Sequence, residues 1–458
     1  QDDELIVLVR CPIAKLKTFA DTIDFKLELD SEALKAALAA GGPNIKPVFI
    51  NDDLKYSPIG CHDNIYGKFD TDLDESLYKV SADRGTPFTK MVRLKLIYYM
   101  LRAPVRQGGC SLEVSKLIFS QKLLSIFPLH DRAETEQLMK VGFAVDCFPW
   151  SLPFEDLKDY FGEKIALYSV FIGHYSKWLI LPGLVGIIFQ LIVWGTGDYS
   201  SPVLPFYSLI ICVWSIVMLE YWKRQQAHTA MQWGMTEFEA EEPERPEFEG
   251  HQIKSFVTGK DMLYFPPEEK SDSLAQSATV VCAYMLLVVG VVSSIYVMRF
   301  SLQGQIGTLA AVLASVINTV QIVVFNFIYR SVVIKLTDHE NPRTDTIYED
   351  SMIVKLFVFQ FVNSYASFFF IAFIAGYLTT QDAADDDAKG QCGATTCMEP
   401  LSINLAIIFG TRLTLTNFLD IFLPYVAYKQ KVKKETEGVE DPTSLTPAEQ
   451  DYMLMDYD

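Results

Sequence analysis

Residues 401–428 read LSINLAIIFGTRLTLTNFLDIFLPYVAY. The stretch is apolar and long enough to cross a lipid bilayer as one helix, since a crossing takes about 20 residues. It nevertheless carries Arg412, Thr416, Asn417 and Asp420 at membrane depth. Ionisable side chains are costly inside a bilayer, so they usually face a partner, a water-filled cavity or a bound ion. We therefore interpret this helix as the mobile wall of a conduit through the membrane.

Arg412, Thr416 and Asp420 recur at every fourth position, which places them on one side of a helix. Gly410 precedes them as an expected bend point. Asp420 suits three roles: a cation ligand, a partner of a basic residue or a proton relay. Calcium takes about six to eight oxygens, and this region offers only the Asp420 carboxylate, the Thr416 hydroxyl and the Asn417 carbonyl. We expect any further carboxylates to come from elsewhere, and the sequence to be the front part of a longer protein.

The chain of 458 residues is 50% hydrophobic, and its apolar residues are grouped in long blocks. This pattern predicts an α-helical polytopic membrane protein. The net charge of −18 comes from acidic loops such as EFEAEEPERPEFE and DAADDD, and no basic stripe is present. We therefore expect no nucleic-acid partner. The sequence contains no paired catalytic carboxylates, no Ser/His/Asp set and no nucleotide motif, so it does not indicate an enzyme.

Residues 1–150 mix short apolar segments with amphipathic ones. ELIVLV and KPVFI are predicted strands, whereas SEALKAALAA and LEVSKLIFSQKLLSI are predicted helices. The pattern predicts a cytosolic α/β domain of ferredoxin-like type, with a regulatory or assembly role. A transmembrane domain over 151–435 and a cytosolic polar segment over 436–458 complete the predicted organisation.

Six membrane spans are predicted from hydropathy. They run over about 178–195, 203–221, 278–298, 306–334, 353–378 and 401–428. Lys and Arg cluster in the loops after the second, fourth and sixth spans and are scarce in the alternate loops. The positive-inside rule therefore predicts that both ends of this sequence face the cytosol.

The last outer loop contains Cys392 and Cys397. Under this topology both lie in an oxidising compartment, where they are expected to pair with each other or with other cysteines. Without histidines they supply only half of a zinc shell, so a disulfide is favoured over a metal site.

Polar residues follow one face of the fifth span and a similar, less regular row in the fourth. These residues are Gln360, Asn363, Ser364 and Ser367 in the fifth span and Ser315, Asn318 and Gln321 in the fourth. They either hydrogen-bond neighbouring helices together or line a hydrophilic furrow, and their proximity to Arg412 and Asp420 favours the furrow.

Glu220 is the other carboxylate at the membrane boundary, in LEYWKR at the end of the second span. It is either a cation ligand or one half of an interfacial ion pair with Lys223 or Arg224.

Several segments resemble the anoctamin family of calcium-activated phospholipid scramblases and chloride channels. They are DYFGEKIALY, LEYWKRQQA, RPEFEG, CMEPLSINLAIIFG and KLTDHENPRTDTIYEDSMIVKLFVFQFVNSYASFFFIAFIAG. The likeness covers most of residues 150–430, with the motifs in the family's order.

The resemblance implies a homodimer in which each subunit has its own furrow, lined by the third to sixth spans. It implies that calcium binds beside the furrow, with Asp420 as a carboxylate ligand and Glu220 in a further calcium site. Thr416 stands where many members carry an Asn ligand, and Gly410 matches the family's hinge glycine.

Anion-selective members carry basic residues at positions that here hold Gln360 and Thr411, although Arg412 is adjacent. A polar furrow with little positive charge fits lipid headgroups or unselective ion flow better than selective chloride passage. The resemblance therefore implies a calcium-activated scramblase of membrane phospholipids. A chloride or other ion channel is the first alternative, and a membrane tether without transport is the second. We expect residence in the plasma membrane or the endoplasmic reticulum.

Overall fold

The computed structural model describes residues 5–30, 33, 66–72, 75–80, 85–142, 148–197, 201–235, 244–254, 261–306, 309–374, 398–411, 413–414, 417–436 and 446–454. The chain divides into two compact units. The first contains residues 1–191, 203–240 and 440–454, and the second contains residues 192–202, 241–439 and 455–458.

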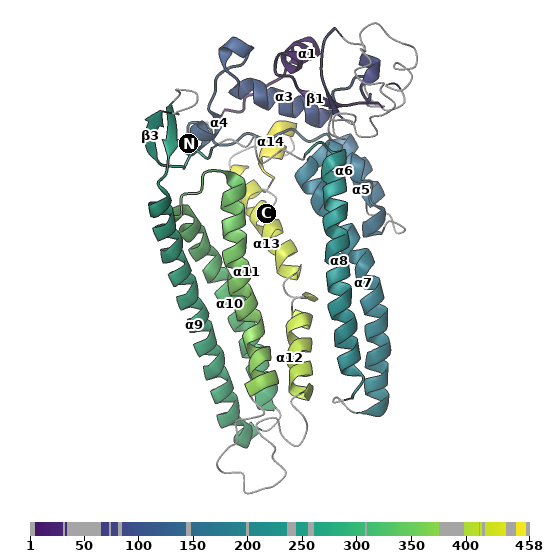
Figure 1. Cartoon of the computed structure of the whole chain (residues 1–458), viewed down its shortest axis with the longest axis vertical. Helices are drawn as coiled ribbons and strands as arrows, with labels where there is room; N and C mark the ends of the chain where they lie inside the picture. Colours follow the sequence, from purple (N-terminus) through teal and green to yellow (C-terminus); the bar gives the residue numbers. More distant parts are fainter. Residues whose placement is uncertain are drawn as a thin grey trace, which may run out of the picture. The chain divides into compact units, whose positions relative to one another are not determined.

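The first unit begins with a small α/β layer (Figure 1). Its helices are α1 (Ile13–Thr22) and α3 (Lys90–Arg102), and its strands are β1 (Lys26–Glu28) and β2 (Tyr66–Lys68). Helices α4 (Val114–Phe119) and α5 (Arg132–Gly142) follow α3 in the same unit. The two strands pair antiparallel, with Lys26 opposite Lys68. Apolar side chains from α1, β1 and α3 form one core with Phe69, Tyr78 and Phe88.

The strands and helices predicted for residues 1–150 agree with the structure only in part. Residues 5–9, within the predicted strand ELIVLV, form no strand, and their side chains are exposed. The prediction of a strand there is wrong, because an apolar segment becomes a strand only when a neighbour pairs with its backbone. KPVFI and most of SEALKAALAA lie outside the described residues, whereas α4 falls within LEVSKLIFSQKLLSI. The ferredoxin-like arrangement stays a prediction.

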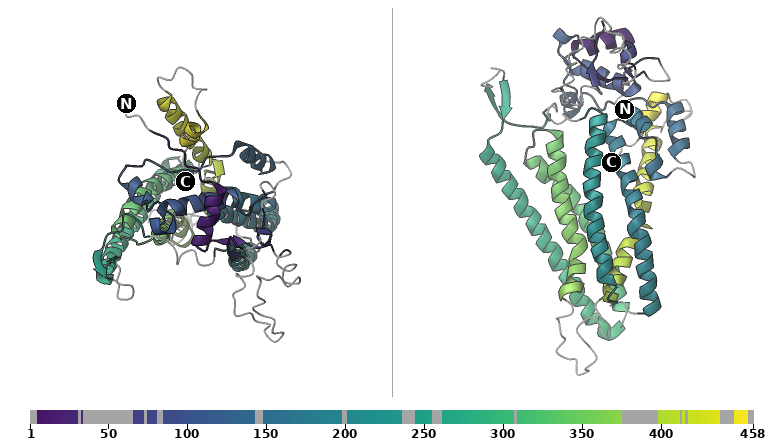
Figure 2. Two further views of the ribbon diagram at one scale, coloured as in Figure 1. Left: turned by 90° about the horizontal axis from the view of Figure 1, so that it is seen from above. Right: turned by 45° about the vertical axis from the view of Figure 1, so that its right-hand side comes forward.

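Two long helices, α7 (Glu163–Thr196) and α8 (Leu204–Gln232), form a hairpin in the first unit (Figure 2). The short helices η4 (Pro149–Ser151) and α6 (Phe154–Phe161) precede them. Ala166, Val170 and Trp233 form the buried cluster at the end of the hairpin beside α6. Farther along, the Trp214 indole nitrogen donates to the Trp178 carbonyl at 3.0 Å.

Helix α14 (Pro447–Tyr452) contacts the segment before α5. The His130 backbone N–H donates to the Asp451 carboxylate at 2.9 Å, and the Phe127 and Tyr452 rings lie 6.0 Å apart. The last described segment of the chain is therefore bonded to the N-terminal part of the same unit.

The second unit is a helical bundle preceded by the antiparallel hairpin of β3 (His251–Lys254) and β4 (Asp261–Tyr264). Its helices are α9 (Pro267–Ile306), α10 (Leu309–His339), α11 (Asp345–Phe369), α12 (Met398–Thr411) and α13 (Asn417–Glu435). Helices α9, α10 and α11 contact one another, and α12 packs on α10 and α11. In the core, the Tyr329 and Phe359 rings stack with centroids 3.7 Å apart.

Five helices among the described residues are long and apolar enough to cross a membrane. They are Glu163–Thr196, Leu204–Gln232, Pro267–Arg299, Leu313–His339 and Asp345–Ile374. They contain most of the first five predicted spans. The sixth predicted range, 401–428, is divided between α12 and α13, with Leu413 and Thr414 in a π-helical turn between them. A sixth crossing therefore stays a prediction.

A buried ion pair fixes the corner between α10 and α11. The Lys355 ammonium donates to the Glu340 carboxylate at 2.6 Å, and both side chains are at most 10% exposed. The Ser351 hydroxyl donates to the same carboxylate oxygen, and the Thr337 hydroxyl accepts from Lys355 at 3.3 Å. Because each charge is matched and further hydrogen-bonded, the corner tolerates two ionised groups away from water.

The segment RPEFEG, residues 245–250, is held against this corner. The Arg245 guanidinium donates to the Asp345 carboxylate at 3.2 Å and lies 4.1 Å from the centroid of the Tyr348 ring. The Asn341 amide donates to the Glu249 carbonyl at 2.6 Å and accepts from the Glu249 N–H. These contacts tie the loop before β3 to the same end of α10 and α11.

We predict that Lys355→Met destabilises the protein by about 3–5 kcal/mol, because it leaves the Glu340 charge buried without its partner. The double variant Lys355→Met with Glu340→Gln should recover most of the loss, since neither side chain is then charged. Unfolding by denaturing detergent in mixed micelles measures both. Additive losses in the double variant would contradict the coupling.

Candidate functional site

A layer of amides joins α10 to α11 inside the second unit. The Gln321 amide donates to the Asn363 carbonyl oxygen at 2.8 Å. Asn363, which is fully buried, donates to the Ile322 backbone carbonyl at 3.1 Å and to the Asn326 side chain at 3.0 Å. Such interhelical bonds are the usual polar contacts between helices in a membrane. The amide side chains of Gln321, Asn363 and Asn326 therefore form one hydrogen-bonded chain between α10 and α11.

Two further helices reach the same polar face of α11. Ser367, seven positions beyond Gln360, accepts at its hydroxyl from the Asn404 amide of α12 at 3.3 Å. The Tyr296 hydroxyl of α9 donates to the Ser367 carbonyl at 3.5 Å. The row of polar residues on α11 thus contacts α9, α10 and α12.

Some polar atoms in this layer are buried and have no hydrogen-bond partner within the described part of the chain. They are both amide atoms of Asn318, the Gln321 carbonyl oxygen and the Asn404 carbonyl oxygen. Burying an amide without a partner costs about 1–3 kcal/mol. These atoms lie on α10 and α12, two helices that pack against each other, and each keeps unused hydrogen-bonding capacity within the described residues.

The other predicted furrow residues do not gather at this layer. Gln360 is exposed, whereas Ser364 is buried on the same helix as Asn363. The half-buried Thr411 donates its hydroxyl to the Ile407 carbonyl at 2.8 Å. Arg412 lies outside the described residues. Of the predicted furrow residues, the structure therefore joins Gln321 of α10 to Asn363 of α11 and does not bring all of them into one layer.

The predicted calcium ligands are only partly described. Asp420 is exposed in the first turn of α13. Asn417, at the start of the same helix, donates its amide to the Leu413 carbonyl at 3.0 Å. Thr416 lies outside the described residues, as do Cys392 and Cys397, so their roles stay predictions.

Asp420 and Asn417 carry the oxygen donors that calcium prefers, but a calcium shell takes about six to eight oxygens. Among the described residues, no three His, Cys, Asp or Glu side chains form a group that could hold a metal ion. The described side chains therefore fit only part of a calcium shell. Glu220, in the first unit, accepts from Lys223 at 2.8 Å, which is the ion pair that the sequence offered as the alternative to a ligand.

Asn404 and Asn326 are the residues of this layer that the sequence analysis missed. Each is a single amide within a long apolar run, SINLAIIFG for Asn404 and VVFNFIY for Asn326. A lone polar residue at membrane depth is itself a signal of a contact between helices.

Residues 157–458 match a family model described as "Anoctamin: Calcium-activated chloride channel". The chain is 26% identical to mouse anoctamin-5 over 432 residues, covering 75% of this chain and 48% of that protein. It is also 26% identical to human anoctamin-7 over 458 residues, covering 82% of this chain and 49% of that protein. The chain spans about half the length of these curated relatives. Since the family model covers well over half of its residues, and its long apolar helices fit a polytopic membrane protein, this chain belongs to the anoctamin family.

Proposed function

We propose that this protein is a calcium-activated phospholipid scramblase whose lipid path follows the contact between α10 and α12. The supporting observation is the set of buried amide atoms on Asn318, Gln321 and Asn404 that have no hydrogen-bond partner in the described part of the chain. Phospholipid headgroups carry both acceptors and donors that such amides would bind. A conduit for headgroups would therefore place its polar groups where this layer lies.

The layer described above would be the closed state of that conduit. Helix α12 packs on α10, so headgroups pass only after these two helices separate. Gly410, in the last turn of α12, has open space where a side chain would begin. Packing therefore does not require a glycine there, and a glycine in a helix interior costs about 1 kcal/mol relative to alanine. This supports Gly410 as the bend point of the moving segment.

Calcium, when bound, would supply positive charge beside Asp420 and favour the conformation in which α13 approaches its other ligands. The role of the chain's own residues is to hold the carboxylate on a helix that is separated from α12 by the turn at Leu413 and Thr414. A shift of α13 can then change how α12 packs on α10.

The same proposal includes the partners and the orientation. The protein would act as a homodimer on membrane phospholipids, with calcium as the activator and both ends of this sequence in the cytosol. The first 150 residues would form a cytosolic regulatory or assembly domain. Residence in the plasma membrane or the endoplasmic reticulum follows from the same family likeness.

A calcium-gated ion channel is the second candidate. Arg299, near the end of α9, is 8% exposed, and its Nε atom has no hydrogen-bond partner within the described residues. A buried cation with a free donor attracts anions. Current recording across a planar bilayer alongside lipid exchange in liposomes separates a channel, which conducts without moving lipid, from a scramblase.

Replacing Asp420 with Ala should raise the half-activating calcium concentration for scrambling about tenfold to a hundredfold, because a contact to a charged group is worth about 1.5–3 kcal/mol. Dithionite quenching of fluorescent lipids in liposomes containing the whole protein measures this shift. Asp350→Asn, on the exposed start of α11, removes one carboxylate elsewhere and is the control. A calcium dependence unchanged by Asp420→Ala would contradict the assignment.

Asn318→Leu should slow scrambling about fivefold or more, the loss expected for one hydrogen bond of about 1 kcal/mol to a passing headgroup. The same change should raise the unfolding midpoint in micelles, because it removes an amide that is buried without a partner.

Asn363→Leu is the matched variant. It should lower the unfolding midpoint, because the amides of Gln321 and Asn326 lose their partner. Asn318→Leu that scrambles lipid at the wild-type rate would exclude a headgroup role for this amide.

A further inference from the structure

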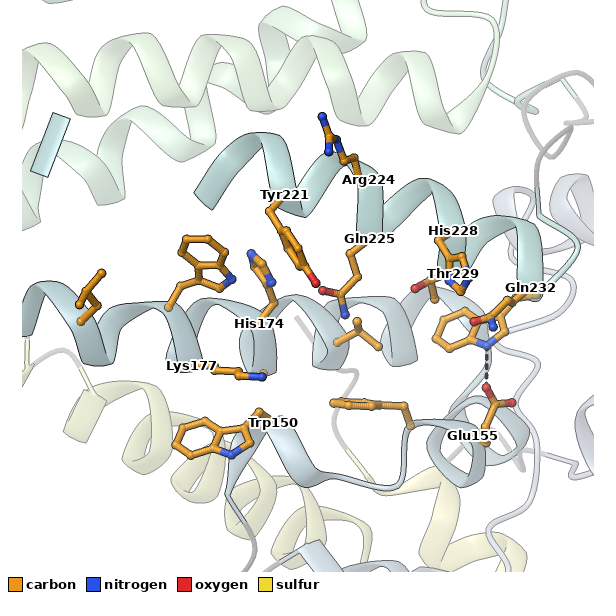
Figure 3. Close-up of a pocket in the computed structure, with 16 residues that line it drawn as sticks. Trp150, Glu155, His174, Lys177, Tyr221, Arg224, Gln225, His228, Thr229 and Gln232 are labelled. Carbon is orange, nitrogen blue, oxygen red and sulfur yellow. Dashed lines mark hydrogen bonds between the residues drawn. The ribbon is translucent and has the colours of Figure 1, made fainter. Parts of the chain in front are cut away.

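A cavity of about 980 Å³ lies in the first unit between α7 and α8, next to η4 and α6. Figure 3 shows His174 and Lys177 on one helix and Tyr221, Arg224, Gln225 and His228 on the other. The residues from α8 recur every three or four positions, so they occupy one face of that helix. The two helices of the hairpin thus leave between them a hollow that basic, polar and aromatic side chains line together.

The charge that borders this cavity is mostly positive. Lys177 and Arg224 contribute one cation from each helix, and His228 contributes a third basic group. Lys177 and His228 make no hydrogen bond or ion pair within the described part of the chain. Their bonding capacity is therefore available to a ligand.

The acidic residue that lines the cavity, Glu155, is already matched. It accepts from the Lys158 ammonium at 2.8 Å and from the Trp233 indole nitrogen at 3.1 Å. Burial by itself would raise the pKa of the Glu155 carboxyl, but these hydrogen bonds outweigh burial and lower the pKa. Glu155 is therefore ionised and paired with Lys158, and it does not neutralise the cations farther along the cavity.

His174 provides an independent sign of a ligand. Its side chain is 6% exposed, and its Nε2 atom has no hydrogen-bond partner within the described residues. The imidazole stacks on the Tyr221 ring, with 4° between the ring planes, and the Trp178 ring lies 5.7 Å away. This packing fixes the ring at the wall of the cavity, so a buried polar nitrogen is held in place without a partner.

The position along the helices indicates which molecules reach the cavity. It lies where the apolar parts of α7 and α8 give way to Lys177, Lys223 and Arg224. Trp178 and Tyr221 stand at the same level, as aromatic residues do at a membrane–water interface. Basic pockets between membrane helices at this level bind the phosphate groups of anionic lipids.

We propose that the cavity between α7 and α8 binds the phosphate-bearing headgroup of an anionic phospholipid. Lys177 and Arg224 supply the positive charge, His174 and Gln225 supply hydrogen bonds, and the aromatic rings border the acyl chains. This site goes beyond the proposed lipid path, because all of its residues belong to the first unit.

The whole protein in phosphatidylcholine nanodiscs tests the site. Short-chain phosphatidylinositol bisphosphate is titrated while tryptophan fluorescence is recorded, because Trp150, Trp178 and Trp233 line the cavity. Lys177→Gln and Arg224→Gln should each weaken binding about fivefold, the effect of one cation near a membrane surface. Lys164→Gln, a basic residue of α7 outside the cavity, is the matched control and should leave binding unchanged.

His174→Phe keeps a ring of similar size against Tyr221 and removes the buried nitrogen, so it should weaken binding while the unfolding midpoint is retained. Soluble inositol trisphosphate and short-chain phosphatidylcholine are titrated in the same way, as the comparison ligands without acyl chains and without net charge, respectively. Binding of the soluble phosphate as tightly as the lipid supports the site and assigns it to a free phosphate compound.

Equal weakening by Lys164→Gln and Lys177→Gln would overturn the proposal, and so would equal binding of phosphatidylcholine. The readout is binding alone, so the result is independent of whether the protein scrambles lipids.

Discussion

The hydrogen bonds of Asn363 are the interaction on which the second unit depends. Inside a bilayer, water cannot bond a buried amide, so each polar side chain must find its partner within the protein. Asn363 bonds to the Gln321 and Asn326 side chains and to a backbone carbonyl of α10, and this fixes how α11 faces α10. The same requirement makes Asn318 informative, because this amide of α10 is almost as deeply buried and has no hydrogen-bond partner among the residues that the structure describes. Satisfied amides hold α10 and α11 together, and the unsatisfied ones are the atoms on which the proposed lipid path rests.

The membrane spans and the polar face of one helix could be predicted from the sequence, because both depend on hydropathy and helical spacing, which are local properties of the chain. The first five spans and the polar face of α11 follow from apolar runs and from the recurrence of Asn363, Ser364 and Ser367. The partners of that face could not be predicted, since spacing assigns a residue to a face but not to the neighbour that covers it. Gln360 shares the spacing yet is exposed, because none of the described residues covers the helix there. Residues 5–9 illustrate the same limit for strands, since apolar composition does not supply a pairing neighbour.

The division of the predicted sixth span could be anticipated only in part. Gly410 and the polar residues after it indicated a bend, and this stays a prediction, since Leu413 and Thr414 are the only described residues between α12 and α13. The spacing of Arg412, Thr416 and Asp420 assumed one continuous helix, however, and a π-helical turn rotates whatever follows it relative to what precedes it. A spacing of 3.6 residues per turn therefore does not place Asp420 on the same side as the residues before the turn.

The bundle contains one firmly held part and one weakly held part. Helices α10 and α11 are joined by the Tyr329 and Phe359 stack and by the buried pair of Lys355 and Glu340, and α9 contacts them through the Tyr284 ring on Tyr329. Moving any of these helices would break charged or aromatic contacts together. Helix α13 is different: its apolar side chains from Phe418 to Tyr425 are mostly exposed within the described residues, so its displacement breaks few contacts. Among the described helices of this unit, motion is therefore least costly in α13, and under the proposed function α12 would transmit it to Asn318 and Asn404. The wall of the proposed conduit would move on the side of the polar layer where packing is weakest, which in the part of this unit that the structure describes is the side of α13.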